Sequence, residues 1–328
     1  MRPSIKNSTI LVVGGAGFIG SHLVDQLLVE GAKKIIVMDN MFLGKRENLD
    51  YAMSKGVLLY VDDAEFESSL EYIFDKYHVD IVFNCATKAL NYSFVNPAHS
   101  YLTNVVVIRN LLEFQRKKAF QTLCHLSSSE VYGTAIYEPM DELHPLNPTT
   151  AYAAGKASAD LMLQSYVKMF NLDAFIVRPF NNYGPRQNYQ GNFAGVIPKT
   201  IMKLLKGEPP EIHGSGDQTR DYVYVKDTVN AIVNIFDKLS AGESIHISSN
   251  HITIKSLIEK ICGIMEYKGP FIYKESRKAD VLSHHSNNKK IKDMIPFTST
   301  EFEKSLLETV NWYKDIYNRD GLNNVKVN

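Results

Sequence analysis

The sequence predicts an α/β protein with a doubly wound parallel sheet and a smaller C-terminal lobe. Two observations predict this class: short apolar runs alternate regularly with helical patterns as far as residue 178, and the alternation becomes less regular after it. Short β-branched runs are typical of strands that helices cover on both faces. We expect a first domain at residues 1–178, to which residues 222–250 cross back in part, and a second lobe formed mainly by residues 179–328.

The first unit of the alternation holds a glycine-rich turn. The apolar run 10–13 predicts a buried strand, residues 19–28 have apolar side chains at helical spacing, and the run 35–38 predicts a second strand that ends at Asp39. The turn between the first strand and the helix has the sequence GGAGFIGSH, with glycines at fixed offsets. Strand, glycine turn, helix, strand and acid together indicate a Rossmann-type βαβ unit that binds a dinucleotide.

The chemistry of a dinucleotide explains this spacing. Gly14 allows the tight turn, Gly17 lets the backbone approach a pyrophosphate, and Gly20 lets the helix pack close to the sheet. Free N–H groups at the start of the helix then face the diphosphate. The Asp39 carboxylate accepts hydrogen bonds from ribose hydroxyls and repels a 2′-phosphate, so NAD is favoured over NADP. The expected cofactor contacts are Gly14, Gly17, Phe18, Ile19, Asp39, Asn40, Asp62, Ala86 and Lys156.

Composition excludes several other classes of protein. The chain has 328 residues, of which 45% are hydrophobic and 22% charged, as is ordinary for a soluble globular protein. It carries 36 basic and 36 acidic residues, so no basic surplus indicates a nucleic-acid partner. Its apolar runs are too short to span a bilayer and no signal-like stretch begins it, so we expect no membrane partner and a cytoplasmic location. Its three cysteines lack metal-type spacing, and we expect no metal ligand among the site residues.

Further elements continue the alternation. The sequence predicts strands at 57–61, 81–86, 122–127 and 175–178, and helices at 70–77, 105–117, 150–170 and 300–319. Asp62 follows the third strand and has two interpretations: its carboxylate bonds the adenine amino group, or it is the N-cap of a helix that starts near Phe66. Thr300 and Glu303 have the spacing of a capping box for the last helix.

Polar side chains gather where the fifth predicted strand ends. Residues 127–133 have the sequence SSSEVYG, at an edge of the sheet that faces the ligand in open α/β folds. Tyr152 and Lys156 stand four apart in a helical region, so both project from one face. An ammonium near a phenol favours the phenolate and moves its pKa from about 10 toward neutrality, which makes it a base for hydride removal. The alternative is a partly buried tyrosine beside a lysine whose ammonium reaches solvent.

Together these motifs resemble those of the extended short-chain dehydrogenases/reductases that modify nucleotide sugars. The resemblance rests on GGAGFIGSH, SSSEVYG, the pair Tyr152 and Lys156, RPFNNYGPRQ and GSGDQTRDYVYVKD, and it runs from residue 10 to about residue 280. It implies an NAD-dependent enzyme that acts on a nucleotide-diphosphate sugar. NAD takes hydride from C4 of the hexose, Tyr152 takes the proton of the 4-hydroxyl, Lys156 supports Tyr152 electrostatically, and Ser128 shares the hydrogen bond. The resemblance also implies a homodimer.

Glu130 bears on what becomes of the 4-keto sugar. In this position the 4-epimerases of the family usually have a small or apolar residue, whereas the hexose 4,6-dehydratases usually have Asp-Glu; here Ser129 replaces the Asp. A carboxylate there suits removal of the C5 proton, which favours a dehydratase or a decarboxylase over an epimerase and does not separate the first two. The other interpretation of Glu130 is a carboxylate that pairs with a nearby Lys or Arg. We expect a 4,6-dehydratase, with a 4-epimerase as the alternative and a UDP-glucuronate decarboxylase or a 4-dehydrogenase after it. A non-catalytic nucleotide-sugar or NAD sensor stays open from another class of function.

The resemblance also implies contacts to the substrate. Asn181 resembles the asparagine that bonds the diphosphate, and Arg220 resembles the arginine of the same phosphate clamp. Arg277 matches a stretch near the nucleotide end, and Val196 lies in residues 192–198, which should line the base pocket. Lys88 lies in a loop that departs from the family pattern, and it has two interpretations: it contacts the substrate, or it faces solvent.

Overall fold

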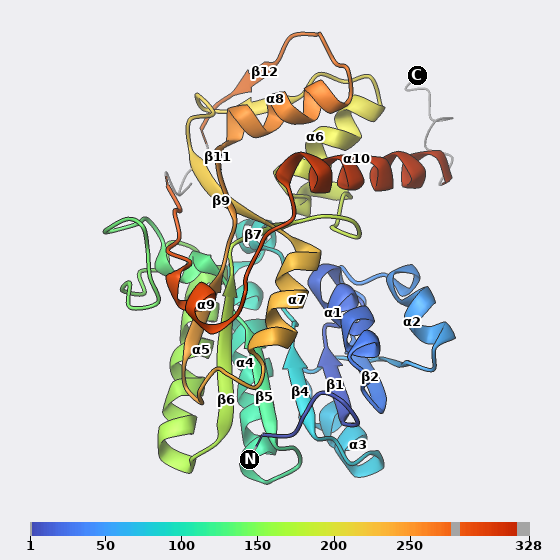
Figure 1. Ribbon diagram of the computed structural model, residues 1–328, viewed down its shortest axis with the longest axis vertical. Helices are drawn as coiled ribbons and strands as arrows, with labels where there is room; N and C mark the ends of the chain where they lie inside the picture. Colours follow the sequence, from blue (N-terminus) through green and yellow to red (C-terminus); the bar gives the residue numbers. More distant parts are fainter. Residues whose placement is uncertain (1, 277–282, 320–328) are drawn as a thin grey trace.

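A seven-stranded parallel sheet forms the larger part of the molecule (Figure 1). The computed structural model describes residues 2–276 and 283–319. The strands lie in the order β10 (Ser244–Ile247), β6 (Asp173–Pro179), β5 (Thr122–Leu126), β4 (Ile81–Asn84), β1 (Thr9–Val13), β2 (Lys34–Asp39) and β3 (Leu58–Val61). Every neighbouring pair is parallel. The strand order reverses between β1 and β4, so the predicted doubly wound α/β fold is confirmed.

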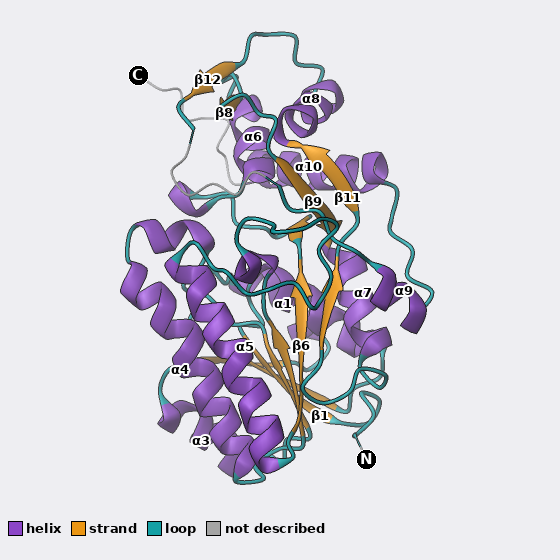
Figure 2. Cartoon of the chain, turned by 90° about the vertical axis from the view of Figure 1, so that its left-hand side faces the viewer, coloured by secondary structure: helices purple, strands orange, loops and turns teal. Residues whose placement is uncertain are grey.

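Helices cover both faces of this sheet because both faces are apolar. Ile10 and Val12 of β1 pack toward α1 (Phe18–Val29) and α7 (Val225–Ile235), whereas Leu11 and Val13 point to the opposite core. That core also contains side chains of α3 (Glu67–Lys76), α4 (Pro97–Arg116) and α5 (Ala151–Phe170), which Figure 2 shows stacked on one side of the strands. Strands buried on both faces lack polar alternation, which is why the sequence shows them as continuous apolar runs.

A second layer of structure lies beyond the carboxyl ends of the strands (Figure 1, top). It contains two small sheets, with the orders β11-β9-β7 and β12-β8. Its elements are β7 (Asn181–Tyr183), α6 (Val196–Leu205), β8 (Glu211–His213), β9 (Thr219–Tyr224), β11 (Asn250–Thr253), α8 (Ile254–Ile264), β12 (Ile272–Lys274) and α10 (Phe302–Arg319). The remaining helices are α2 (Asp50–Ser54) and α9 (Lys289–Met294). Tyr183, Ile201, Leu257 and Leu306 share its core, so these elements pack as one unit.

The predicted capping box of the last helix is wrong. The helix begins at Phe302, and the Thr300 hydroxyl donates instead to Asp227 at 2.7 Å, with the Thr300 N–H bonded to the same carboxylate at 2.8 Å. Glu303 pairs with Lys260 at 2.6 Å. The Thr300 hydroxyl therefore bonds Asp227, which is distant in the sequence, instead of capping the helix as the local spacing predicts. None of the described helices combines the length and apolarity needed to cross a membrane.

Candidate active site

A cavity of about 410 Å³ opens at the carboxyl ends of β1, β2, β4 and β5. Its wall includes Val13, Asp39, Cys85 and Leu126, each at or next to the end of one of these strands. The cavity thus lies where the strand order reverses, which is where open α/β sheets bind their ligands. Its volume is within the range of small-molecule sites, about 300–1,000 Å³.

The glycine turn shapes one wall of this cavity. Gly14 has φ +76°, and a Cβ atom there would lie 2.7 Å from the Ala86 nitrogen, so no side chain fits. A Cβ on Gly20 would lie only 2.2 Å from the Gly14 carbonyl oxygen, whereas the nearest atom to a Cβ on Gly17 would be the same oxygen at 3.2 Å. The first and third glycines therefore serve packing, while the second leaves the backbone bare beside the cavity at the start of α1.

Asp39 is held rigidly at the end of β2. Its carboxylate accepts hydrogen bonds from the backbone N–H groups of Ala16 and Met41, both at 2.9 Å. Burial raises the pKa of Asp39, and the backbone hydrogen bonds oppose that shift. Asp39 is 7% exposed and lines the cavity, where its carboxylate suits the hydroxyls of a ribose.

Asp62 does not cap α3, so that interpretation is wrong. The N-cap of α3 is Phe66, which makes no side-chain cap, and the Asp62 carboxylate accepts instead from the Ser69 hydroxyl at 2.8 Å. Asp62 and Asn40 both line the cavity, and the Asn40 amide donates to Asp63 at 2.7 Å. The contact of Asp62 with adenine stays a prediction.

All residues expected to contact the cofactor line this one cavity. They are Gly14, Gly17, Phe18, Ile19, Asp39, Asn40, Asp62, Ala86 and Lys156. A bare glycine backbone at a helix N-terminus suits a pyrophosphate, and a buried carboxylate suits a ribose. The residues present therefore fit a dinucleotide.

The four expected catalytic residues line the same cavity. They are Ser128, Glu130, Tyr152 and Lys156. The Ser128 hydroxyl caps the 3-10 turn Ser129–Tyr132 by accepting from the Glu130 N–H at 3.2 Å, and it is also hydrogen-bonded to Tyr152. The Lys156 ammonium donates to the Leu126 carbonyl at 2.7 Å. Strand β5, its following turn and helix α5 therefore place a phenol, a hydroxyl, a carboxylate and an ammonium together.

The electrostatics of this group correct one expectation. Burial raises the pKa of Tyr152 to about 12, although hydrogen bonds from Ser128 and Thr87 act in the opposite direction. Burial also lowers the pKa of Lys156 to about 8, against the attraction of Asp160. In the chain by itself the phenol pKa is therefore not moved toward neutrality, because burial outweighs the two hydrogen bonds and the negative charges of Glu130 and Asp160 raise the pKa further. The interpretation of Lys156 as a lysine that reaches solvent is also wrong, since it is 1% exposed.

Buried polar side chains that the sequence analysis did not assign to the site lie beside the catalytic residues. Asp160 lies one helical turn after Lys156 and accepts from the Ser127 hydroxyl at 2.9 Å and from Arg178 at 3.0 Å. Arg178 also donates to the Tyr132 hydroxyl at 2.7 Å. The sequence contained one sign of these buried side chains: Asp160 lies on the buried face of a helix and Arg178 in a buried strand, and charged residues are unusual in both places.

Thr87 is another residue to which sequence reasoning gave no role. Its side chain is hydrogen-bonded to the Tyr152 hydroxyl, and its hydroxyl donates to Asn104 at 2.8 Å. Arg186 also lines the cavity and pairs with Asp25 at 2.8 Å. Arg186 stands in the motif RPFNNYGPRQ, so the motif contained this sign of a site residue.

The expected substrate contacts are placed unevenly. Asn181 and Val196 line the cavity, whereas Arg220 is outside the wall formed by the described residues and donates to the Thr219 carbonyl at 2.8 Å. Lys88 is 3% exposed, with its ammonium 4.3 Å from the centroid of the Phe42 ring, so the solvent interpretation is wrong. Arg277 lies outside the described residues.

Comparison with known proteins identifies a family that this chain matches. A family model described as the NAD dependent epimerase/dehydratase family matches residues 10–248. A UDP-glucose 4-epimerase of Mycolicibacterium smegmatis is 29% identical over 309 residues, covering 93% of this chain and 98% of the relative. The structure of a UDP-glucose 4-epimerase with UDP-glucose from Thermotoga maritima is 32% identical with a TM-score of 0.88, covering 94% of this chain and 99% of that one. The dTDP-glucose 4,6-dehydratase DesIV from Streptomyces venezuelae, solved with NAD bound, is 28% identical with a TM-score of 0.89, covering 95% and 98%.

Proposed function

The chain belongs to the NAD dependent epimerase/dehydratase family, and from this premise we propose that it converts a nucleotide-activated hexose through a 4-keto intermediate and acts as a 4,6-dehydratase. It is an enzyme of a family whose cofactor is NAD. Bound NAD supplies the acceptor for the hydride of C4 and later the donor of a hydride. The residues of the chain bind, orient and move protons around that exchange.

The first proton transfer belongs to Tyr152 in this proposal. Its hydroxyl lies in a hydrogen-bonded pair with Ser128, so a sugar 4-hydroxyl that replaced part of this contact would meet both groups. Because the pKa of Tyr152 is about 12 in the chain by itself, the phenol first gives its own proton to solvent when the ligands bind. Lys156, fixed by its bond to Leu126, supplies positive charge that stabilises the resulting phenolate. The phenolate then takes the proton of the sugar hydroxyl as a general base.

The position of Glu130 is the observation that carries the choice of dehydration over epimerisation. Its carboxylate lies in the cavity wall, and its charge raises the pKa of Tyr152, so the two groups are within electrostatic reach. A ketone at C4 acidifies the proton on C5, which Glu130 then removes. The C6–O bond breaks, and Glu130 returns its proton to the departing hydroxyl, because the neighbouring Ser129 is a poor acid. Hydride adds to C6, and a proton from solvent adds to C5.

A 4-epimerase is the second candidate. The relatives from Mycolicibacterium smegmatis and Thermotoga maritima are both named UDP-glucose 4-epimerase, and they cover almost the whole chain. In that case Glu130 would position the sugar, and the same Tyr152 would return the proton to the 4-hydroxyl after the hydride had added to the other face.

The experiment that tests the proposal is incubation with a panel of UDP-, GDP-, CDP- and dTDP-hexoses followed by mass measurement of the products. A dehydratase yields a product that has lost one water. A product of unchanged mass with inverted C4 would establish the epimerase instead, and loss of carbon dioxide from a uronic acid would establish a decarboxylase. Release of NADH together with a 4-keto sugar that has lost neither water nor carbon dioxide would indicate a 4-dehydrogenase.

Binding of the nucleotide part is proposed for residues around the second lobe. Asn181 faces the cavity and suits the diphosphate, and Val196 suits the base. Lys88 is buried in the same wall beside Phe42, where an anion of the ligand would offset its charge. Arg220 is proposed for the same diphosphate through N–H groups other than the Nη1 group that donates to the Thr219 carbonyl.

We further propose that the protein is a homodimer. Leu102 of α4 and Leu161 of α5 are 49% and 55% exposed on two helices that pack side by side. A pair of helices with apolar outer side chains suits a helical bundle with a second copy. Light scattering of the purified chain gives the mass directly, and a mass of one chain would contradict this proposal.

A further inference from the structure

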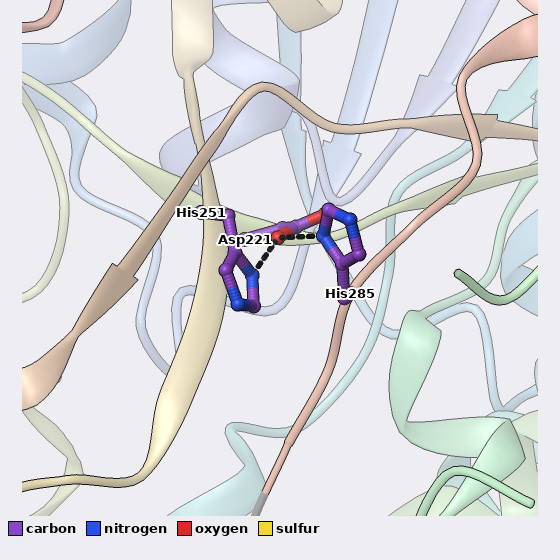
Figure 3. Close-up of side chains that lie close together, drawn as sticks. All are labelled: Asp221, His251 and His285. Carbon is purple, nitrogen blue, oxygen red and sulfur yellow. Dashed lines mark hydrogen bonds and ion pairs between the residues drawn. The ribbon is translucent and has the colours of Figure 1, made fainter. Parts of the chain in front are cut away.

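Two histidines and one aspartate from three chain segments meet outside the cavity (Figure 3). Asp221 of β9 and His251 of β11 are directly opposite each other in an antiparallel pair. His285 comes from the segment that precedes α9. Figure 3 shows the two imidazole rings on either side of the Asp221 carboxylate.

The donor atoms of the three side chains converge. The Asp221 Oδ1 atom lies 2.6 Å from Nδ1 of His251 and 3.4 Å from Nδ1 of His285. The other carboxylate oxygen, Oδ2, accepts the Ser286 N–H at 2.7 Å, which fixes the orientation of the carboxylate. The ring centroids are 4.3 Å apart with an angle of 58° between the planes. Each histidine therefore presents the same nitrogen to one oxygen.

We propose that Asp221, His251 and His285 bind one divalent transition-metal ion of the Zn²⁺ type. Imidazole nitrogens and a carboxylate oxygen are donors that Zn²⁺ prefers, and a set of three leaves the fourth position of a tetrahedron open. Within the part of the chain that the structure describes, this is the group of three such side chains whose donor atoms all lie within 4.8 Å of one another.

The distances and exposure suit an ion after small movements. Two ligand atoms of a tetrahedral zinc ion lie about 3.3 Å apart. The contact of Asp221 with His285 already has this length, and the contact with His251 must open by several tenths of an ångström. The side chain of His251 is 36% exposed and that of His285 41% exposed, whereas that of Asp221 is 2% exposed. The carboxylate is thus the fixed ligand, and the two rings are free to adjust and leave the fourth position to water.

The site would tie the segment around His285 to the sheet of the second lobe. The His285 carbonyl accepts from the Met140 N–H at 2.7 Å, and the Asp221 carbonyl accepts from Asn181 at 3.3 Å. An ion would therefore link β9, β11 and the segment that contacts Met140. This link would lie next to Asn181, a residue of the cavity wall. An ion that binds the folded chain but not the unfolded chain raises the melting temperature of the protein.

Zinc titration of the untagged, full-length protein tests the proposal without reference to its catalytic activity. The protein is freed of metal with a chelator and titrated with Zn²⁺ alone by calorimetry, and Co²⁺ absorption reports the geometry. We expect one strong equivalent of Zn²⁺ per chain, four-coordinate Co²⁺ bands and a rise in Tm. His251→Gln and His285→Gln should each weaken binding by about 100-fold or more, because even outer-shell partners of metal ligands contribute about 10- to 100-fold.

His78→Gln is the matched control, since its side chain is 92% exposed and lies outside the cluster. This variant should bind Zn²⁺ as the original chain does. Both cluster variants replace half-exposed side chains, so circular dichroism and Tm without metal should show that they fold. Equal Zn²⁺ affinity in the original chain and both cluster variants, or no stoichiometric binding at all, would show that the three side chains form only a hydrogen-bonded cluster.

Discussion

The Lys156 ammonium donates a hydrogen bond to the Leu126 carbonyl at 2.7 Å, which ties helix α5 to the last residue of strand β5. Ser128 follows Leu126 by two residues, and Tyr152 precedes Lys156 by one helical turn. This bond therefore helps to hold the turn that carries the Ser128 hydroxyl beside the helix that carries the Tyr152 phenol. The ammonium reaches this place at the cost of its hydration, as the lowered pKa of Lys156 records.

Replacing Lys156 with Met should change how stability depends on pH. The pKa of Lys156 falls from 10.5 to about 8 in the fold, so between these values the unfolded chain binds the extra proton. The burial penalty is complete below pH 8 and disappears as the pH rises to 10.5. The original chain should therefore gain stability relative to Lys156→Met across this window, by about 3 kcal/mol at most. Denaturant unfolding of both chains without cofactor, at pH 7 and pH 10.5, measures the difference.

Lys168→Met is the control for this prediction, because Lys168 is an exposed lysine of the same helix. Its difference from the original chain should stay constant over the same range of pH. A constant difference for Lys156→Met as well would mean that the ammonium is not desolvated in the folded protein.

Tyr152→Phe should remove the base and leave the fold and the cofactor site intact. The ring is 9% exposed and stays in place in the variant, while the hydroxyl that contacts Ser128 and Thr87 is lost. We expect turnover to fall by about 10²- to 10⁴-fold, the usual contribution of a general base. NAD affinity, measured by fluorescence, should change less than about threefold. Tyr137→Phe, at an exposed tyrosine, provides the control, and a loss of turnover as small in Tyr152→Phe as in Tyr137→Phe would remove Tyr152 from its proposed role.

Two glycines of one turn should respond in different ways to the same substitution. A methyl group at Gly20 would lie 2.2 Å from the Gly14 carbonyl oxygen, so α1 would have to move from the sheet. Gly20→Ala should cost about 1–3 kcal/mol of stability or more, as overpacked cores do. A methyl group at Gly17 meets that oxygen at 3.2 Å and otherwise borders the cavity.

Gly17→Ala should therefore keep most of the stability and weaken NAD binding by about 10- to 100-fold, the worth of one charged hydrogen bond. Thermal unfolding without cofactor and NAD titration of both variants separate the two effects. If Gly17→Ala lost as much stability as Gly20→Ala and bound NAD normally, the backbone at Gly17 would not face the pyrophosphate.

Local pattern was enough to predict six of the seven strands of the central sheet, all but β10, but not the contacts that join distant segments. Strands such as β1 are buried on both faces, so their apolar runs are visible without any tertiary information. The glycine turn was equally visible, because its chemistry fixes the spacing. In contrast, Thr300 binds Asp227, 73 residues away, rather than its own helix. His251 and His285 lie 30 and 64 residues from Asp221, and no spacing in the sequence connects them. The pKa of Tyr152 depends on how deeply the phenol is buried. The helical spacing of Tyr152 and Lys156 in the sequence gives no information about that burial.

Glu130→Gln should separate the oxidation of C4 from the elimination of water. The amide keeps the size of the side chain and its place after Ser128 but does not accept a proton from C5. The variant, incubated with substrate in deuterated water, should still form bound NADH, because Tyr152 and Lys156 are unchanged. Deuterium should not enter C5, and no dehydrated product should form. Absorbance of NADH and mass spectrometry of the recovered sugar give both results from one sample, so the first serves as the control for the second. Deuterium at C5 at the original rate would mean that another base acts there, and full epimerisation by the variant would favour the 4-epimerase over the dehydratase.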